Sequence, residues 1–312
     1  MKNYYLIAGL PRSGSTLLSN ILLQNPHFHV TPTSGILDLL LYARNSWHKH
    51  PAFLAMPRSE SNARQLGVLR GMLDGYFSVA PQAVCFDKNR IWLEYLEMAA
   101  AILGGREKVK VIVTVRDLRD VLASFERVYR DTSALSQVAF DANDNIGTKT
   151  TLQRVQLFID NGQVVGRAYN AIRDAVTRGW LDQMHFVEYE ALTRQPAETL
   201  QGIYRFLGEE PGAHQFSAVE QITQEDDLFH GFQDLHTIRP AVAPQAPRWP
   251  AMFDRTVRDS KTWSDIEKVA TFWRAYQLPG GAPPGELSTN TPVQDIPGAP
   301  APSTFFPAGT PQ

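Results

Sequence analysis

The chain has 312 residues, of which 43% are hydrophobic, and its formal net charge is −2 at pH 7. This composition can build one large α/β domain, or one domain with a small appendage. The near-neutral charge gives no support for a nucleic-acid-binding surface or a polybasic membrane-binding segment, so any basic site must be local.

Cysteine content and hydropathy bear on the cellular compartment. Cys85 is the single cysteine, so one chain cannot form an internal disulfide, and no Asn-X-Ser/Thr glycosylation sequence is present. The apolar run from Tyr4 leads directly into a glycine-rich turn, unlike a signal peptide, and no stretch reaches the length of a membrane span. We therefore expect a soluble cytoplasmic protein in which Cys85 is a small buried hydrophobe.

The first predicted element is a short strand that leads into a helix. Residues 4–8 are apolar, and leucine and isoleucine recur at helical spacing over residues 17–22. The loop that joins them contains Pro11, Arg12, Ser13, Gly14, Ser15 and Thr16. Backbone N–H groups at a helix start lack intrahelical partners and carry partial positive charge, so the loop predicts a phosphate-binding site. The alternative is a loop that only turns the chain.

This loop differs from a Walker A motif at an informative position. Gly9 and Gly14 have the Walker A separation, but Ser15 replaces the lysine and the cation is Arg12, inside the loop. In NTPases that lysine contacts the β- and γ-phosphates, so its loss argues against ordinary ATP or GTP chemistry. The run Gly-Leu-Pro-Arg-Ser-Gly-Ser-Thr-Leu resembles the 5′-phosphosulfate loop of the sulfotransferases, particularly the branch that includes the tyrosylprotein sulfotransferases. The eukaryotic tyrosine-directed members are membrane-anchored Golgi enzymes, and we expect this chain to differ from them in having no membrane anchor.

Residues 25–80 weaken the resemblance. His27 and His29 share one face of a predicted strand, but no third metal ligand is nearby, so we predict no metal site. Ser34 is the predicted cap of a helix over 36–43. In the tyrosylprotein branch a glutamate base follows this region, whereas here the nearest acid is Asp38, either a base or a solvated helix residue. A second helix is predicted to bury a stripe of Leu66, Leu69, Leu73 and Phe77.

A second buried strand, residues 83–86, precedes Asp87 and Lys88. Polar residues at the carboxyl end of a strand lie at the usual ligand edge of an open parallel sheet. Similar lysines at strand ends occur in sulfotransferases, where they help to hold the sulfonate. The resemblance therefore implies that Lys88 stabilises charge, and the alternative is a structural ion pair with Asp87.

The strand over residues 109–115 is followed by Arg116, and Ser124 comes eight residues after it on the next predicted helix. This arrangement resembles the sulfotransferase motif that holds the 3′-phosphate of 3′-phosphoadenosine 5′-phosphosulfate (PAPS), and Arg116 and Ser124 match it residue for residue. In the same helix Arg119 and Arg127 add local positive charge or are solvated.

The later segments resemble the family more loosely. Residues 131–180 are predicted to be mainly helical, with a surface turn at residues 141–145 and a helix over 153–173 that could form the acceptor pocket or a homodimer contact. Tyr189, on a strand predicted over 184–192, either contacts the nucleotide or only packs. Arg239 and Arg248 match cations that fold over the nucleotide in the tyrosylprotein branch, although Pro247 replaces a serine there. His236 is an alternative base on the acceptor side.

We therefore predict a P-loop-type α/β fold, an open parallel sheet with helices on both faces. Residues 1–277 form the domain, with a last helix near 264–276, and the Pro/Gly-rich residues 278–312 form a flexible or surface-draped tail. The resemblance implies in-line sulfonyl transfer from PAPS to an unidentified hydroxyl or amine acceptor without a metal. Arg12 and Lys88 would be catalytic, with Asp38, Asp87 or His236 as base. The alternatives are a catalytically silent nucleotide-binding protein and a P-loop small-molecule kinase.

Overall fold

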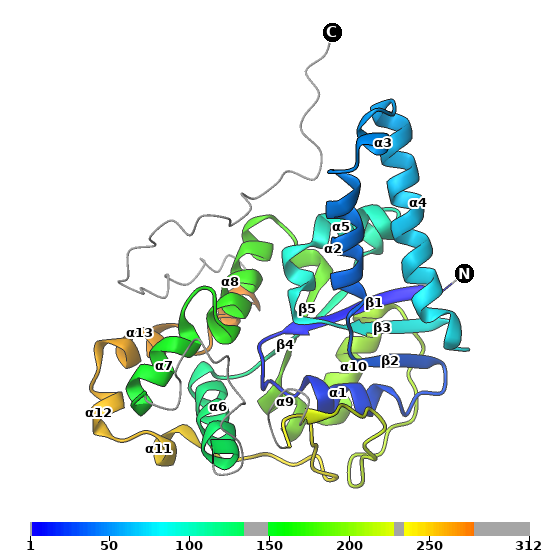
Figure 1. Cartoon of the computed structure of the whole chain (residues 1–312). Helices are drawn as coiled ribbons and strands as arrows, with labels where there is room; N and C mark the ends of the chain where they lie inside the picture. The colour runs from blue at the N-terminus through cyan, green and yellow to red at the C-terminus, as the bar shows by residue number, and fades with distance from the viewer. Residues whose placement is uncertain (1, 134–148, 228–233, 278–312) are drawn as a thin grey trace.

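The centre of the molecule is a five-stranded sheet with the order β2-β3-β1-β4-β5 (Figure 1). The computed structural model describes residues 2–133, 149–227 and 234–277. The strands are β1 (Asn3–Gly9), β2 (Phe28–Thr33), β3 (Val84–Lys88), β4 (Val111–Val115) and β5 (Met184–Glu188). All neighbouring strands pair in parallel, which confirms the predicted open parallel sheet.

Helices cover both faces of this sheet, as the sequence predicts (Figure 1). Side chains of successive β1 residues point to opposite faces, so Tyr4 and Leu6 join one core while Tyr5 and Ile7 join the other. The second core is closed by α1 (Ser15–Leu22) and α10 (Pro196–Leu207). The first and larger core is closed by α2 (Ile36–Trp47), α4 (Arg58–Tyr76), α5 (Leu96–Leu103), α6 (Leu118–Ser133) and α8 (Val164–Thr177).

Short helices complete the described chain. They are α3 (Pro51–Leu54), α7 (Thr151–Ile159), α9 (Tyr189–Arg194), α11 (Trp249–Met252), α12 (Arg255–Arg258), α13 (Lys261–Val269) and α14 (Arg274–Gln277). Four 3₁₀ helices are η1 (Phe77–Val79), η2 (Arg90–Glu94), η3 (Arg106–Lys108) and η5 (Leu181–Gln183). No helix in these ranges is long and apolar enough to cross a membrane.

Two predicted elements end earlier than expected. The strand predicted over 184–192 stops at Glu188, because Glu188 pairs with the last residue of β4, Val115, and Tyr189 begins α9. The helix predicted over 264–276 is interrupted after α13, where the carbonyl of Ala270 accepts a hydrogen bond from the N–H of Leu118 instead of continuing the helix.

Two further helix predictions need correction. The segment 153–173 forms α7 and α8 rather than one helix, and Gly166 lets α8 approach α7, since a Cβ there would lie 2.3 Å from the carbonyl oxygen of Ile159. Leu66 does not belong to the core stripe and is 39% exposed, whereas Leu69, Leu73 and Phe77 are buried. Cys85 is buried as predicted. The turn at 141–145 and the tail 278–312 lie outside the described residues.

Candidate active site

The candidate site lies where several strands end at the carboxyl edge of the sheet. The glycine-rich loop follows β1, Lys88 ends β3, Arg116 follows β4 and Tyr189 follows β5. Because β1 lies between β3 and β4, the loop separates Lys88 from Arg116. A cavity of about 520 Å³ opens at this edge, a volume typical of small-molecule sites.

The loop depends on two glycines with positive φ. A Cβ on Gly9, at φ 127°, would lie 2.2 Å from the carbonyl oxygen of Thr114 on β4. A Cβ on Gly14, at φ 85°, would lie 2.7 Å from the ring of Tyr189. Arg12 also has a positive φ, 57°, which is uncommon for a residue with a side chain and points to a functional constraint. Gly14 precedes α1, whose start has no side-chain cap.

Most residues of the loop face the cavity. Those that line it are Pro11, Arg12, Gly14, Ser15 and Thr16. The side chain of Ser13 is buried instead, with its Oγ within hydrogen-bonding distance of the Leu10 carbonyl oxygen and 2.8 Å from Thr114 Oγ1. Ser13 therefore holds the loop against β4, and any contact it makes with an anion would come from its backbone.

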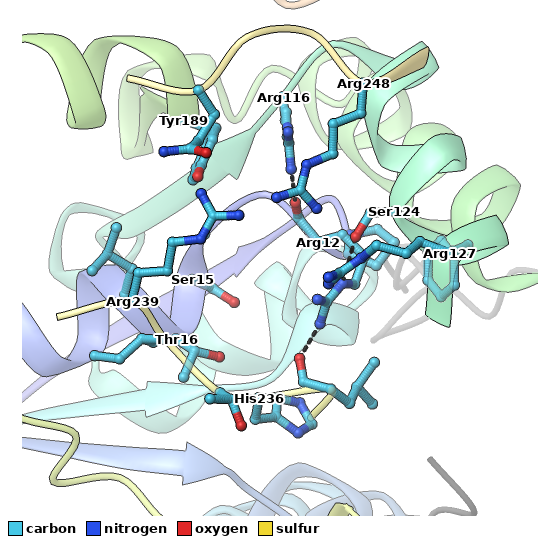
Figure 2. A pocket seen from close by; sticks show the side chains of 18 of the residues that line it. Arg12, Ser15, Thr16, Arg116, Ser124, Arg127, Tyr189, His236, Arg239 and Arg248 are labelled. Atoms are coloured by element: carbon cyan, nitrogen blue, oxygen red, sulfur yellow. Dashed lines mark hydrogen bonds between the residues drawn. The ribbon is translucent and has the colours of Figure 1, made fainter. Parts of the chain in front are cut away.

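Arg116 and Ser124 both lie beside Arg12 of the loop (Figure 2). Arg12 Nε donates a hydrogen bond to Ser124 Oγ over 3.1 Å, and Arg12 also donates to the carbonyl oxygen of Leu235. Arg116 Nη1 lies 3.4 Å from the carbonyl oxygen of Arg12, and its guanidinium lies 4.3 Å from the centre of the Tyr189 ring. The two matched motifs, more than a hundred residues apart in sequence, thus share one wall of the cavity.

Carboxylates behind this wall orient Arg116. Asp120 lies 3.7 Å and Glu190 4.0 Å from its guanidinium nitrogens. Asp120 also accepts a hydrogen bond of 2.7 Å from the backbone N–H of Arg248. The same carboxylate therefore fixes Arg116 and ties the segment that carries Arg248 to α6.

Six arginines line the cavity, and none of the described lining residues is acidic. They are Arg12, Arg90, Arg116, Arg127, Arg239 and Arg248. Burial and the neighbouring Arg127 and Arg116 lower the pKa of Arg12 to about 10, and burial with nearby arginines also lowers the pKa of Arg248. Mutual repulsion of this kind is relieved by an anionic ligand, so the lining fits a polyanion.

A second polar group lies at the end of β3. Lys88 Nζ is 2.9 Å from Glu225 Oε1, and both side chains are 8% exposed. Glu225 also accepts from the backbone N–H of Thr33 at 2.8 Å, and its Oε2 is 3.3 Å from Nε2 of His236. Asp227 Oδ1 lies 2.5 Å from the other ring nitrogen of His236. Thr33 and His236 line the cavity, whereas Lys88 and Glu225 lie behind them.

The electrostatics of this group follow from its burial. Desolvation lowers the pKa of Lys88 despite the favourable Glu225 charge. Desolvation would raise the pKa of Glu225, but the charge and hydrogen bond of Lys88 outweigh it and the net shift is downward. Burial also lowers the pKa of His236, while Asp227 and Glu225 act in the opposite direction. Glu225 is thus held ionised, and His236 favours the neutral form that a base requires.

The two other candidate bases lie away from the cavity. Asp38 is exposed on α2 and does not line it. Asp87 precedes Lys88, so its side chain points to the opposite face of the sheet, where it accepts a 2.6 Å hydrogen bond from Trp92 Nε1. Burial raises the pKa of Asp87 to about 6. The alternative ion pair between Lys88 and Asp87 is therefore wrong, since Lys88 pairs with Glu225.

Sequence reasoning missed Glu225, Asp227 and Arg90. The first two belong to the acidic run 225–227, which precedes His236 by about ten residues, and this proximity was the available signal. The described ranges contain no group of three or more His, Cys, Asp or Glu residues that could hold a metal ion.

Comparisons with known proteins bear on this site. A model of the sulfotransferase family matches residues 6–211, more than half of the chain. No curated protein sequence matches significantly.

Solved structures that resemble this chain include two sulfotransferase domains and a mouse sulfotransferase. The sulfotransferase domain of a Synechococcus olefin synthase is 20% identical, with 89% of this chain and 96% of that chain covered and a TM-score of 0.49. A mouse sulfotransferase complexed with 3′,5′-adenosine bisphosphate (PAP) is 15% identical, with 89% of each chain covered and a TM-score of 0.49. The sulfotransferase domain from the curacin biosynthetic pathway is 15% identical, with 92% of this chain and 94% of that chain covered and a TM-score of 0.47. By its match to the family model, the chain belongs to the sulfotransferase family.

Proposed function

We propose that the protein moves a sulfonyl group from PAPS to a hydroxyl or amine acceptor by in-line transfer. One observation carries this proposal: the glycine-rich loop and the Arg116–Ser124 pair meet in a cavity that six arginines line without any described acidic residue. A sugar, a small alcohol or amine, a lipid-like alcohol and a peptide tyrosine all fit this reaction class as acceptors.

The residues present fit the co-substrate. Arg116 and Ser124 are the proposed 3′-phosphate ligands. Arg239 and Arg248, which line the same cavity as Tyr189, are proposed to cover the nucleotide (Figure 2). The N–H groups at the start of α1 and the guanidinium of Arg12 are proposed to stabilise negative charge at the 5′-phosphate. When bound, PAPS supplies the activated sulfonyl group, with the nucleotide 5′-phosphate as leaving group.

His236 is the proposed base. Its Nδ1 faces Asp227 at 2.5 Å, which would fix the tautomer and orient the ring, and the residue lines the cavity. Glu225 lies 3.3 Å from Nε2, so the imidazolium that forms when His236 takes the acceptor proton would be stabilised from both sides. Lys88 does not line the cavity and pairs with Glu225, so its proposed role is to hold that carboxylate beside His236 rather than to contact the sulfonyl oxygens. Asp38 and Asp87 remain outside this proposal because they do not line the cavity.

Radiolabelled sulfonyl transfer tests the function. PAPS labelled in the sulfonyl group is mixed with panels of phenols, alcohols, amines and sugars in excess EDTA, and label in the acceptor is measured. We expect metal-independent transfer that falls at least about a hundredfold in His236→Gln. Tight PAP binding with no transfer across the panel would favour the silent nucleotide-binding protein. Consumption of Mg²⁺-ATP in place of PAPS would favour the kinase.

A further inference from the structure

We propose that Arg90 binds an anionic group of the acceptor, so the acceptor class is a hydroxyl or amine compound with an apolar body and a carboxylate, sulfate or phosphate. This inference rests on the proposed function and names its substrate class. It starts from an arginine that lines the cavity but does not belong to either sulfotransferase motif.

Arg90 is free for a ligand. It begins the 3₁₀ helix η2, two residues after Lys88, and forms no hydrogen bond or ion pair with any described residue, although it lines the cavity. Arg90 is an exposed residue that lines the cavity, so it is accessible to a ligand. A guanidinium with no hydrogen-bonded partner in the described chain can form charge-assisted hydrogen bonds with an anion in the cavity.

The charged residues around Arg90 differ from those around the arginines that are proposed to bind the nucleotide. Its electrostatic neighbours are Arg167 and Glu225, and it acts in turn on Lys88. Arg12 and Arg248 interact mainly with other arginines, Arg116 and Arg127 among them, although Asp227 also acts on Arg12. Arg90 therefore lies on the Lys88 side of the loop, together with Glu225, which contacts the proposed base His236.

The nearby carboxylates are already engaged. Glu225 accepts from Lys88 and from the Thr33 N–H. Glu94, also on η2, forms a bidentate ion pair with Arg167 of α8, at 2.6 and 2.8 Å. Neither carboxylate neutralises Arg90 directly, so this part of the cavity keeps a positive charge for the ligand.

An apolar wall accompanies this charge. The end of α7 and the start of α8 contribute Leu157, Phe158 and Val164 to the cavity lining, together with the amide of Gln163. α8 packs against η2, which brings this wall beside Arg90. A ligand with its reacting hydroxyl at His236 could thus place an apolar body on this wall and its anionic group on Arg90.

Matched acids and amides test the inference. Hydroxyphenylpropionate and a hydroxydecanoate are titrated calorimetrically into PAP-saturated protein beside their primary amides, which keep the body and remove the charge. We expect at least one acid to bind about tenfold or more tightly than its amide. Arg90→Gln should abolish this preference and leave PAP affinity unchanged, and Arg90→Lys should retain part of it.

Arg127→Gln is the matched control, because Arg127 lines the same cavity without a hydrogen bond or ion pair to any described residue but lies beside Arg12. It should weaken PAP binding and keep the preference for acids at saturating PAP. Failure of every acid to bind, equal affinity of acids and amides, or a preference that survives Arg90→Gln would overturn the inference. Loss of PAP affinity in Arg90→Gln would also overturn it, by assigning Arg90 to the nucleotide. No PAP binding by the wild-type protein would overturn the proposed function itself, so the two failures are distinguishable.

Discussion

His236 lies between the carboxylates of Asp227 and Glu225, and its proposed role as a base depends on its pKa. Burial lowers the pKa of His236, and Asp227 raises it through a hydrogen bond to Nδ1. A base must be neutral, so activity should be lost as pH falls through this pKa, which lies below the usual value of 6.5.

Asp227→Asn should move this acidic limb to lower pH, because the variant removes an interaction that favours the imidazolium. The maximal rate should also fall, by about tenfold to a hundredfold, since the imidazolium formed during transfer loses its partner. Rate–pH profiles of the two proteins measure the shift, with PAP affinity as the control for folding. An acidic limb that does not move would show that His236 is not the base.

Asp87 affects stability rather than transfer. Burial raises its pKa from 3.8 to about 6, so the folded protein binds this proton more tightly than the unfolded chain. The resulting stabilisation is complete below about pH 4 and is lost as pH rises through 6, by at most about 3 kcal/mol.

Asp87→Asn should therefore flatten the dependence of unfolding free energy on pH between 4 and 6 and should stabilise the protein at pH 7. Asparagine can still accept the hydrogen bond from Trp92. Urea titrations across this range make the measurement, and Asp182→Asn, at an exposed position, is the matched control. Parallel curves for wild type and Asp87→Asn would contradict the account.

At the residue scale, the sequence predicted groups that belong to local motifs. Arg12, Arg116 and Ser124 lie within short strand-to-helix segments, and the parallel sheet brings those segments together. Glu225 could not be predicted in the same way. It reaches Lys88 across 137 positions from a loop without regular structure, and no periodic pattern encodes that contact.

At the scale of elements, the glycine-rich loop and α1 act as one unit with Tyr189. Gly14 has φ 85°, and its missing Cβ makes room for the Tyr189 ring. The strand–loop–helix order here was predictable, because the apolar period changes from that of a strand to that of a helix. The ends of β5 and α13 could not be predicted, because each is set by hydrogen bonds to a distant segment.

Gly14→Ala should disrupt this unit. The substitution introduces a strained φ and a contact of 2.7 Å with Tyr189, so we expect about 1–3 kcal/mol of lost stability and at least tenfold weaker PAP binding. Gly35→Ala is the matched control, since a Cβ there meets nothing within 4 Å and φ is −94°. Thermal unfolding and calorimetry report the two effects. Wild-type PAP affinity in Gly14→Ala would contradict the proposed role of the loop.

For the whole molecule, the alternation of apolar strands and helical segments was sufficient to predict the parallel α/β architecture. The core extends to Phe272 and Trp273, which are 3% and 0% exposed, and Phe272 packs against both Tyr169 of α8 and Trp273. The division into a domain over 1–277 and a tail over 278–312 stays a prediction, made from composition.

A chain that ends at Gln277 tests this division. It keeps the buried residues near the end of the described chain, so it should unfold cooperatively at a temperature within a few degrees of the full chain and bind PAP equally well. A chain that ends at Ala270 removes Phe272 and Trp273 and should fail to fold. Loss of stability or PAP binding in the chain that ends at Gln277 would show that residues 278–312 belong to the domain.

This cavity is proposed to recognise the 3′-phosphate of a PAPS-type nucleotide through Arg116. Calorimetric titration of metal-free protein with PAP and with ADP, for wild type and Arg116→Ala, tests it most directly. Arg119→Ala is the control, since Arg119 pairs with Asp117 and does not line the cavity. The account predicts micromolar PAP binding, a preference over ADP of at least about tenfold, and loss of that preference in Arg116→Ala alone. Equal affinity for PAP and ADP, or a preference that survives the substitution, would contradict it.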